Sequence, residues 1–233
     1  RTEGSVAIGT DALTALTTGA GNVAIGFQAG DAITTAPENT AIGYQALSAN
    51  IEGYANTAIG YGALVNCAGG AEEQANVVVG REAGYGIVGG RFNVSVGNKT
   101  MQNLDTTSNL GNTAIGHTSM KGSGSSNSAQ YNTSVGYASL FALTTGNSNV
   151  IVGSEAGHAI TTGRSNVALG REALGTETQG DRSTAIGYYA LNEQISGSLN
   201  LMVYNTALGS HAGQKITTGI HNTILGGLAG DLM

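Results

Sequence analysis

One five-residue phrase recurs 13 times along this chain, and it constrains the fold more than any other feature. The phrase reads Asn (Ser in the copies at Ser5 and Ser183), then Val or Thr, then a small or apolar residue, then Ile, Val or Leu, and finally Gly, as in NTAIG at Asn39–Gly43. Most of the closing glycines lie 17 residues apart, and the longest spacing is 22. A repeat of this length is typical of a solenoid, in which each repeat forms one coil that stacks on the preceding coil. The closing glycines are Gly9, Gly26, Gly43, Gly60, Gly80, Gly97, Gly116, Gly136, Gly153, Gly170, Gly187, Gly209 and Gly226.

Composition excludes several other classes of protein. The chain has 38 glycines, but they do not recur at every third position, which excludes collagen. A hydrophobic content of 40% with a strict period can bury surface, which argues against disorder. The net charge of −6 and the absence of a basic stripe argue against a nucleic-acid partner. No apolar run approaches the roughly 20 residues that span a membrane, so we expect one repetitive domain over residues 1–233 without membrane insertion.

The phrase itself predicts a short parallel strand. In a strand, Thr57 and Ile59 share one face and Ala58 takes the other. No charged residue occurs at any phrase position in any copy, which indicates that both faces are covered. Stacked Asn side chains can form a hydrogen-bonded ladder, and the invariant Gly predicts a corner with positive φ or backbone packed too closely for a Cβ. The residues that illustrate the predicted ladders are Asn22, Asn39 and Asn56, then Ile25, Ile42 and Ile59, and Gly26, Gly43 and Gly60.

A second inward-facing element is expected after each glycine. Ala follows three residues later in 10 copies, and Leu, Met or Gly comes next, as in Ala46 and Leu47. A helix is excluded because no apolar stripe of period 3.6 persists and β-branched residues dominate the phrase. We therefore predict an all-β fold, a parallel β-solenoid of about 13 coils of 17–22 residues, which at a coil rise of about 4.8 Å gives a rod of roughly 60 Å.

The phrase resembles the head repeats of YadA-like trimeric autotransporter adhesins, and it is similar to the NTAIGYQAL-type repeats of bacteriophage tail fibres, those of marine phages in particular. Asn39–Leu47 matches this string letter for letter, Asn56–Leu64 differs from it at one position, and Ser183–Leu191 differs at two. The resemblance covers nearly the whole chain. It implies a left-handed roll that assembles as a homotrimer on the surface of a cell or a virion. The repeat is longer than the usual YadA-like unit, and no coiled-coil stalk, membrane anchor or chaperone domain is visible.

Assembly is also expected on physical grounds. A thin coil has little interior, and a long charge-free strand face is usually an interface. Closed cyclic symmetry buries such a face without open-ended aggregation. The 12 residues of Asn222–Met233 and the 4 residues of Arg1–Gly4 together nearly complete one 17-residue coil. An end-to-end filament of subunits, or a piece cut from a longer array, is therefore the alternative arrangement.

No catalytic or metal-binding constellation stands out, and no cofactor is expected, so an enzyme is not predicted. The four histidines occupy different repeat positions without metal-ligand spacing, and no Ser lies in a nucleophile elbow. Aromatic residues follow the closing glycine in five coils, and the first three are predicted to lie in file about 4.8 Å apart. Two interpretations remain open: a platform that contacts sugar rings or a receptor, and structural stacking at the roll surface or a subunit interface. These residues are Phe27, Tyr44, Tyr61, Tyr137 and Tyr188.

Four coils are longer than 17 residues, and their extra residues are expected to bulge outward as loops that make specific contacts. The predicted function is a structural and adhesive rod of a phage tail fibre or extracellular surface fibre, which contacts itself and a glycan or protein receptor. A purely structural filament subunit is the second hypothesis, and an ice-binding solenoid the third. The long-coil segments are Asn66–Ala75, Met101–Gly111, Met120–Tyr131 and Asn192–Tyr204.

Overall fold

The structure, a computed structural model of the chain, describes residues 4–104, 110–123, 128–198 and 201–231. The chain divides into two compact units. The first comprises Arg1–Asn112 with Gly124–Ser128, and the second comprises Thr113–Ser123 with Ala129–Met233. The described residues contain strands and turns but no helix, so the predicted all-β class is confirmed.

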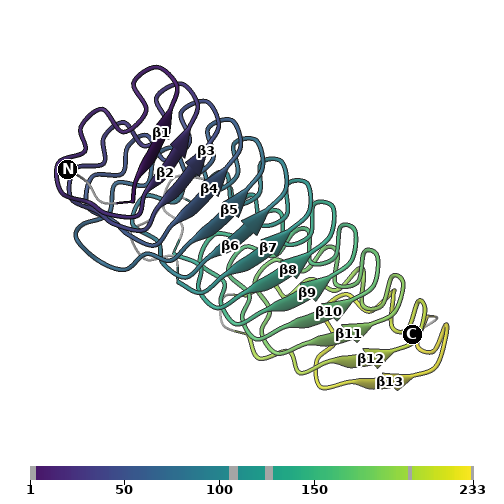
Figure 1. Ribbon diagram of the computed structural model, residues 1–233. Coiled ribbons are helices and arrows are strands. Elements are labelled where there is room, and N and C mark those ends of the chain that lie inside the picture. Colours follow the sequence, from purple (N-terminus) through teal and green to yellow (C-terminus); the bar gives the residue numbers. More distant parts are fainter. Residues whose placement is uncertain (1–3, 105–109, 124–127, 199–200, 232–233) are drawn as a thin grey trace. The chain divides into compact units, whose positions relative to one another are not determined.

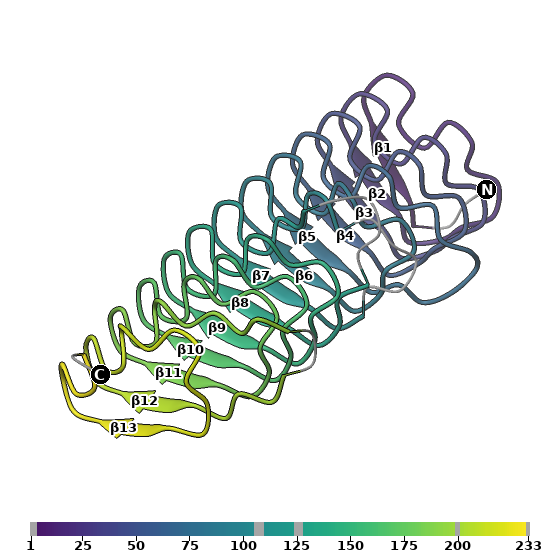
Figure 2. The ribbon, with the colours of Figure 1, turned by 180° about the vertical axis from the view of Figure 1, so that it is seen from behind.

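The first unit is a parallel β-solenoid with one three-residue strand in each coil (Figure 1). Each strand pairs with the strand of the next coil, and identical phrase positions face each other, as in Thr40↔Thr57 and Ile42↔Ile59. The opposite side of each coil is made of turns and irregular segments (Figure 2). The strands are β1 (Val6–Ile8), β2 (Val23–Ile25), β3 (Thr40–Ile42), β4 (Thr57–Ile59), β5 (Val77–Val79) and β6 (Val94–Val96).

The second unit has the same construction. Its strands also pair in parallel and in chain order, with register such as Val167↔Thr184 and Leu169↔Ile186. The longer spacings do not shift this register, because Thr184 still pairs with Thr206 across the 22-residue coil. The strands are β7 (Thr113–Ile115), β8 (Thr133–Val135), β9 (Val150–Val152), β10 (Val167–Leu169), β11 (Thr184–Ile186), β12 (Thr206–Leu208) and β13 (Thr223–Leu225).

The cores of the coils combine short side chains with one or two long ones. In coil Asn39–Leu47, Ala41, Ala46 and Leu47 are buried, and Asn39 is buried beside them. Full burial of an aliphatic side chain such as Leu47 contributes about 1.5–3 kcal/mol to the free energy of unfolding. The thin coil leaves little room for larger groups. The prediction of a second inward-facing element is thus confirmed, although it is a turn and not a strand.

Two residues of this turn adopt the left-handed conformation in nearly every coil. Gln45 and Leu47 have φ values of 52° and 55°. Left-handed backbone costs a non-glycine residue roughly 1–2 kcal/mol, so the turn must be held by other interactions. The amide of Gln45 donates to Phe27 O in the preceding coil at 2.8 Å, and that of Leu47 donates to Ala63 O in the following coil at 3.0 Å. The alternating left-handed residues therefore direct amides toward both neighbouring coils.

The predicted Asn ladder is present and buried. The side-chain oxygen of Asn39 accepts from the amide nitrogen of Asn56 at 3.0 Å and from its Nδ2 at 3.2 Å. Nδ2 of Asn39 donates to Gly53 O at 3.1 Å. One Asn side chain therefore serves as both donor and acceptor and joins neighbouring coils without leaving a buried amide unpaired.

The closing glycine is required for both of the predicted reasons. Gly43 has a φ of +134°, and a Cβ built there would lie 2.4 Å from Gly60 O in the next coil. Backbone cannot move away as a flexible side chain can, so the close stacking of coils excludes every other residue at this corner.

The prediction that both strand faces are covered is wrong for the single chain. Only the middle residue of each strand points inward, as Ala41 does in β3. The second and fourth phrase positions form an outer strand face, which is half-buried in most coils and exposed in several. Solvent reaches this face because a strand in so thin a coil has an interior on one side only. The face nevertheless carries no charged residue.

Candidate functional site

Three of the predicted aromatic residues form a continuous stack in the first unit. The ring centroids of Phe27 and Tyr44 are 5.2 Å apart, and those of Tyr44 and Tyr61 are 5.0 Å apart, with interplanar angles of 13° and 7°. The Arg81 guanidinium lies over the Tyr61 ring, 5.8 Å from its centroid. The rings therefore turn their faces toward one another and leave mainly their edges and hydroxyl groups to solvent. The predicted file is confirmed, and its role in glycan contact stays a prediction.

The other two predicted residues belong to separate clusters in the second unit. Tyr137 stacks on His117 at 5.6 Å. Tyr188 makes edge contacts with Tyr189 at 4.5 Å and with His211 at 5.1 Å. The structure thus places the five residues on three distinct clusters rather than on one aromatic stripe.

All four histidines contact an aromatic ring in a neighbouring coil, a pattern that sequence reasoning missed. The centroid of His158 is 5.0 Å from that of Phe141, with an interplanar angle of 9°, and His221 lies 5.5 Å from Tyr204. The sequence could have indicated these contacts, because each histidine lies one repeat length before or after its aromatic partner. Three lysine or arginine side chains in this unit also lie over aromatic rings, as Lys121 lies over Phe141 at 5.4 Å.

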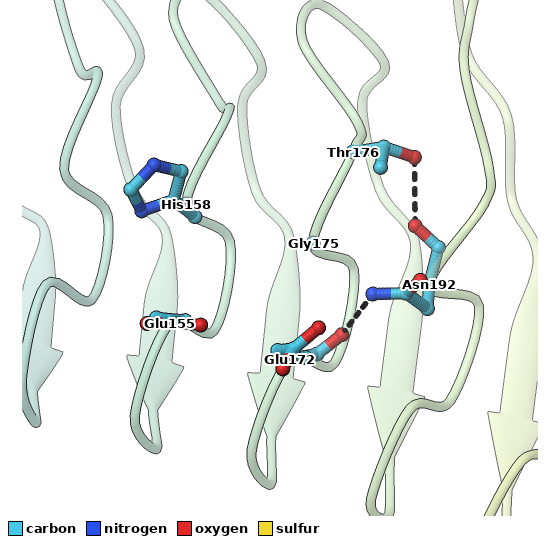
Figure 3. Close-up of a pocket in the computed structure, with 6 residues that line it drawn as sticks. All are labelled: Glu155, His158, Glu172, Gly175, Thr176 and Asn192. Carbon is cyan, nitrogen blue, oxygen red and sulfur yellow. Dashed lines mark hydrogen bonds between the residues drawn. The ribbon is translucent and has the colours of Figure 1, made fainter.

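The second unit carries a surface groove of about 310 Å³ that the sequence did not indicate (Figure 3). Its residues come from three successive coils at the second, fifth and sixth positions after the closing glycine. Asn192 Nδ2 donates to the Glu172 carbonyl oxygen at 2.9 Å, and Thr176 Oγ1 donates to Asn192 O at 2.7 Å, which fixes one wall. The lining residues, which define the Gly175 groove, are Glu155, His158, Glu172, Gly175, Thr176 and Asn192.

The groove exists because one coil lacks a side chain. His158, Gly175 and Asn192 occupy the same repeat position in consecutive coils. The Asn192 amide leans toward Gly175, where a Cβ would lie 2.6 Å from Asn192 Nδ2, so the space that Gly175 leaves open lies on the His158 side. The two carboxylates differ in their surroundings. Glu172 pairs with Arg171 at 3.1 Å, whereas Glu155 has no ion pair within the described residues. A hydrogen bond with Glu172 is the main reason that the pKa of Tyr189 rises to about 12.

The longer coils send polar side chains inward as well as loops outward, which corrects the expectation that their extra residues only bulge. In segment Asn66–Ala75, Cys67 and Gln74 are buried, and the thiol donates to Gln74 Oε1 at 3.1 Å. Burial raises the pKa of the Cys67 thiol to about 11. Gln74 Oε1 also accepts from Asn56 Nδ2 at 2.8 Å, so this insertion is anchored to the Asn ladder.

Segment Asn192–Tyr204 is anchored by a buried carboxylate. Glu177 accepts hydrogen bonds from Gln194 Nε2 at 2.9 Å and Ser196 Oγ at 2.6 Å, and from the amides of residues 178–180. Burial by itself would raise the pKa of Glu177, but the hydrogen bonds outweigh it and hold the pKa below its ordinary value. Gln194 also bridges the Asn ladder at the coil where Ser183 replaces Asn. Its Nε2 donates to Ser183 Oγ at 2.9 Å, and its Oε1 accepts from Asn205 Nδ2 at 2.8 Å.

The other two long segments are described only in part. Residues 105–109 of Met101–Gly111 and residues 124–127 of Met120–Tyr131 lie outside the described residues, as do residues 199–200 of Asn192–Tyr204. Met101, Leu104 and Met120 are buried at the bases of their loops. The predicted contact role of all four segments stays a prediction.

The outer strand face presents aliphatic side chains in both units. At the fourth phrase position, Ile115 is 40% exposed, Leu169 46% and Leu208 46%. At the second position, Val77 and Val150 are similarly exposed. Because the strands pair in register, the fourth position forms a row of Ile, Val and Leu side chains along each unit, and the second position forms a row that mixes Val and Thr.

Among the described residues, no group of three or more His, Cys, Asp and Glu side chains is arranged to hold a metal ion. The same part of the chain contains no helix long and apolar enough to cross a membrane. The fold and these surfaces define a repetitive parallel β-solenoid with a bare apolar strand face. Comparisons with protein-family models, curated proteins and solved structures gave no match, so the function is argued from the surfaces alone.

Proposed function

We propose that this chain is a structural and adhesive component of a fibre, on a phage tail or on a cell surface, that assembles with copies of itself. The single observation that carries this proposal is the outer strand face. One of its rows is Ile, Val or Leu and the other is Val or Thr, it carries no charge in any coil, and it is half-buried or exposed in the single chain. A contiguous apolar patch on a protein surface favours an interface.

Energetics support association through this face. Burial of apolar surface contributes roughly 25 cal/mol per Å², and each coil offers one aliphatic residue and one Val or Thr to a partner. Each coil of the stack adds its own free energy of apolar burial, whereas translational and rotational freedom is lost only once per association. A closed ring of copies, such as a trimer, would cover the face without leaving an edge for further growth.

A receptor role rests on the long coils. In two of these segments, buried hydrogen bonds of Gln74 and Gln194 hold the described residues at the base. A loop held in this way loses little conformational entropy when it binds, which suits a contact surface displayed on a rigid scaffold. Exposed aromatic residues such as Tyr131 and Tyr204 lie at the ends of two of these segments.

The alternatives differ in what they require of the surface. A purely structural filament needs the outer strand face but no receptor, and it remains the second proposal. Ice binding needs free, regularly spaced hydroxyl groups. The Thr144 and Thr161 hydroxyls instead donate to the carbonyl oxygens of Thr161 and Thr178, at 3.0 Å each, so this row does not favour ice binding.

Charge on the outer strand face tests the proposal. Leu169→Glu places a carboxylate at a residue that is 46% exposed, and we expect sedimentation equilibrium to show a smaller assembly than for the unmodified chain. Ile51→Glu is the matched control, because Ile51 is 48% exposed but lies outside the phrase. Equal masses for both variants and the unmodified chain would contradict assembly through this face.

A further inference from the structure

The Gly175 groove lies on a different segment of the coil from the outer strand face, and it has features of a binding site. Its walls carry two carboxylates, an imidazole, an amide and a hydroxyl group from coils that the hydrogen-bond ladder holds in place (Figure 3). Its volume of about 310 Å³ corresponds to roughly ten water molecules at about 30 Å³ each, so a side-chain-sized group fits. This inference does not depend on self-assembly.

The shape of the groove suits a flat group. One face of the His158 ring stacks on Phe141 in the preceding coil at 5.0 Å, and His158 has no other aromatic contact within the described residues. The equivalent position in the following coil is Gly175, which has no side chain. A flat group stacks on an imidazole at about 3.5–4 Å, which is less than one coil rise of about 4.8 Å. A planar group therefore fits beside His158.

The groove is lined by two carboxylates, only one of which has a cationic partner within the described residues. Glu155 and Glu172 occupy the same repeat position in adjacent coils, so both carboxylates lie beside the gap. Only Glu172 has a cationic partner, Arg171, within the described residues. A cation that enters the groove would meet the unpaired carboxylate of Glu155, and charge-assisted hydrogen bonds to carboxylates are stronger than neutral ones.

The chain's own surface already pairs cations with aromatic rings. Four aromatic rings have a cationic side chain above them at 5.4–5.9 Å, contributed by Arg81, Lys121, Arg171 and Arg182. Three of these four cations are guanidinium groups. A planar cation stacked on a ring is thus the arrangement that this surface already uses, and at Gly175 the chain does not supply one.

We propose that the Gly175 groove binds the guanidinium group of an arginine in a partner peptide, which stacks on His158 and pairs with Glu155 and Glu172. The guanidinium group is flat, always charged and able to pair with carboxylates through two parallel hydrogen bonds. A neutral sugar ring brings no charge to pair with the carboxylate of Glu155. The Glu155 carboxylate determines the preference for a cation, and Gly175 determines the preference for a flat group.

The test follows the imidazole signals of the four histidines by NMR in the full chain at neutral pH. Acetyl-arginine-amide is the probe, acetyl-citrulline-amide is its flat but uncharged analogue, and methyl galactoside is the sugar probe. We expect acetyl-arginine-amide to shift the His158 signal saturably, with little change at His117 and His221. The citrulline analogue should bind up to about fivefold more weakly, which is the upper end of the range for one exposed charge pair.

Two matched variants separate the groove from general charge effects. Glu155→Gln should weaken arginine binding by a similar factor. Glu82→Gln should leave it unchanged, because Glu82 has the same repeat position but pairs with Arg81 and Lys99, at 3.0 and 3.7 Å, away from the groove. The proposal is overturned if the sugar shifts His158 as strongly as arginine does, if citrulline or Glu155→Gln binds equally well, or if arginine gives no saturable shift.

Discussion

Replacement of Asn149 by Ala tests how much of the stability comes from the buried Asn ladder. Asn149 is fully buried in the second unit. Its side-chain oxygen accepts from the amide nitrogen of Asn166 at 2.9 Å, and its Nδ2 donates to Gly163 O at 2.9 Å and to Asn132 Oδ1 at 2.9 Å. The ladder therefore joins three successive coils at this residue.

The magnitude follows from the groups that lose their partners. Asn132 Oδ1 still accepts from the Asn149 amide at 3.0 Å, so it stays paired. The Asn166 amide and the Gly163 carbonyl lose the bonds that Asn149 makes to them. Each buried, unpaired group costs about 1–3 kcal/mol, so Asn149→Ala should lower the free energy of unfolding by roughly 2–6 kcal/mol.

The assay is equilibrium urea unfolding followed by circular dichroism, with amide hydrogen exchange as a local readout. Asn147→Ala is the matched control, because Asn147 lies two residues away and makes no side-chain hydrogen bond within the described residues. Its effect should stay within about 0.5 kcal/mol, as is usual for surface substitutions. Exchange at the Asn166 amide should accelerate only in Asn149→Ala. If the two variants lose equal stability, the ladder is not a main source of it.

Four further predictions concern single coils. Gly43→Ala should prevent or severely destabilise folding, since its Cβ would lie 2.4 Å from backbone oxygen in the next coil, and the yield of folded protein measures this directly. Because the folded-state pKa of Glu177 lies below its unfolded value of 4.5, its contribution to stability is present above pH 4.5 and is lost as the pH falls through the folded pKa. Urea unfolding against pH should therefore be flatter below pH 4.5 for Glu177→Gln, and equal slopes would contradict the carboxylate's role. Thr118→Asn should raise the unfolding free energy by up to about 1 kcal/mol, because Thr118 is a β-branched residue at a φ of 53°. If Tyr44 and Tyr61 contact sugars, their joint replacement by Ala should abolish binding on a glycan array, and unchanged binding would exclude that role.

Strict periodicity made part of this structure predictable. Asn39, Ile42 and Gly43 recur at fixed positions, so any in-register stack places each beside its own copies, whatever the details of the coil. The same logic predicted the stack of Phe27, Tyr44 and Tyr61. The alignment of equivalent repeat positions was therefore enough to predict these ladders and the aromatic stack, without knowledge of side-chain packing.

The features that sequence reasoning missed depend on contacts between unlike positions. The left-handed backbone of Leu47 runs against the ordinary preference of leucine, and it is held by the hydrogen bond from the Leu47 amide to Ala63 O in the following coil. Glu177 and Gln194 are ordinary surface residue types that are buried only because an insertion folds inward. The Gly175 groove arises from a missing side chain between His158 and Asn192, and such an absence becomes visible only when consecutive coils are compared position by position.

The molar mass of the unmodified chain in solution tests the central claim most directly. The chain has a mass of 23.3 kDa, and a bare, charge-free strand face that is covered by copies predicts a larger species. Multi-angle light scattering across a range of concentrations should give an integral multiple of this mass, three for the trimer and a growing series for the filament. A constant mass of 23.3 kDa at every concentration would contradict the claim that the outer strand face is an assembly surface.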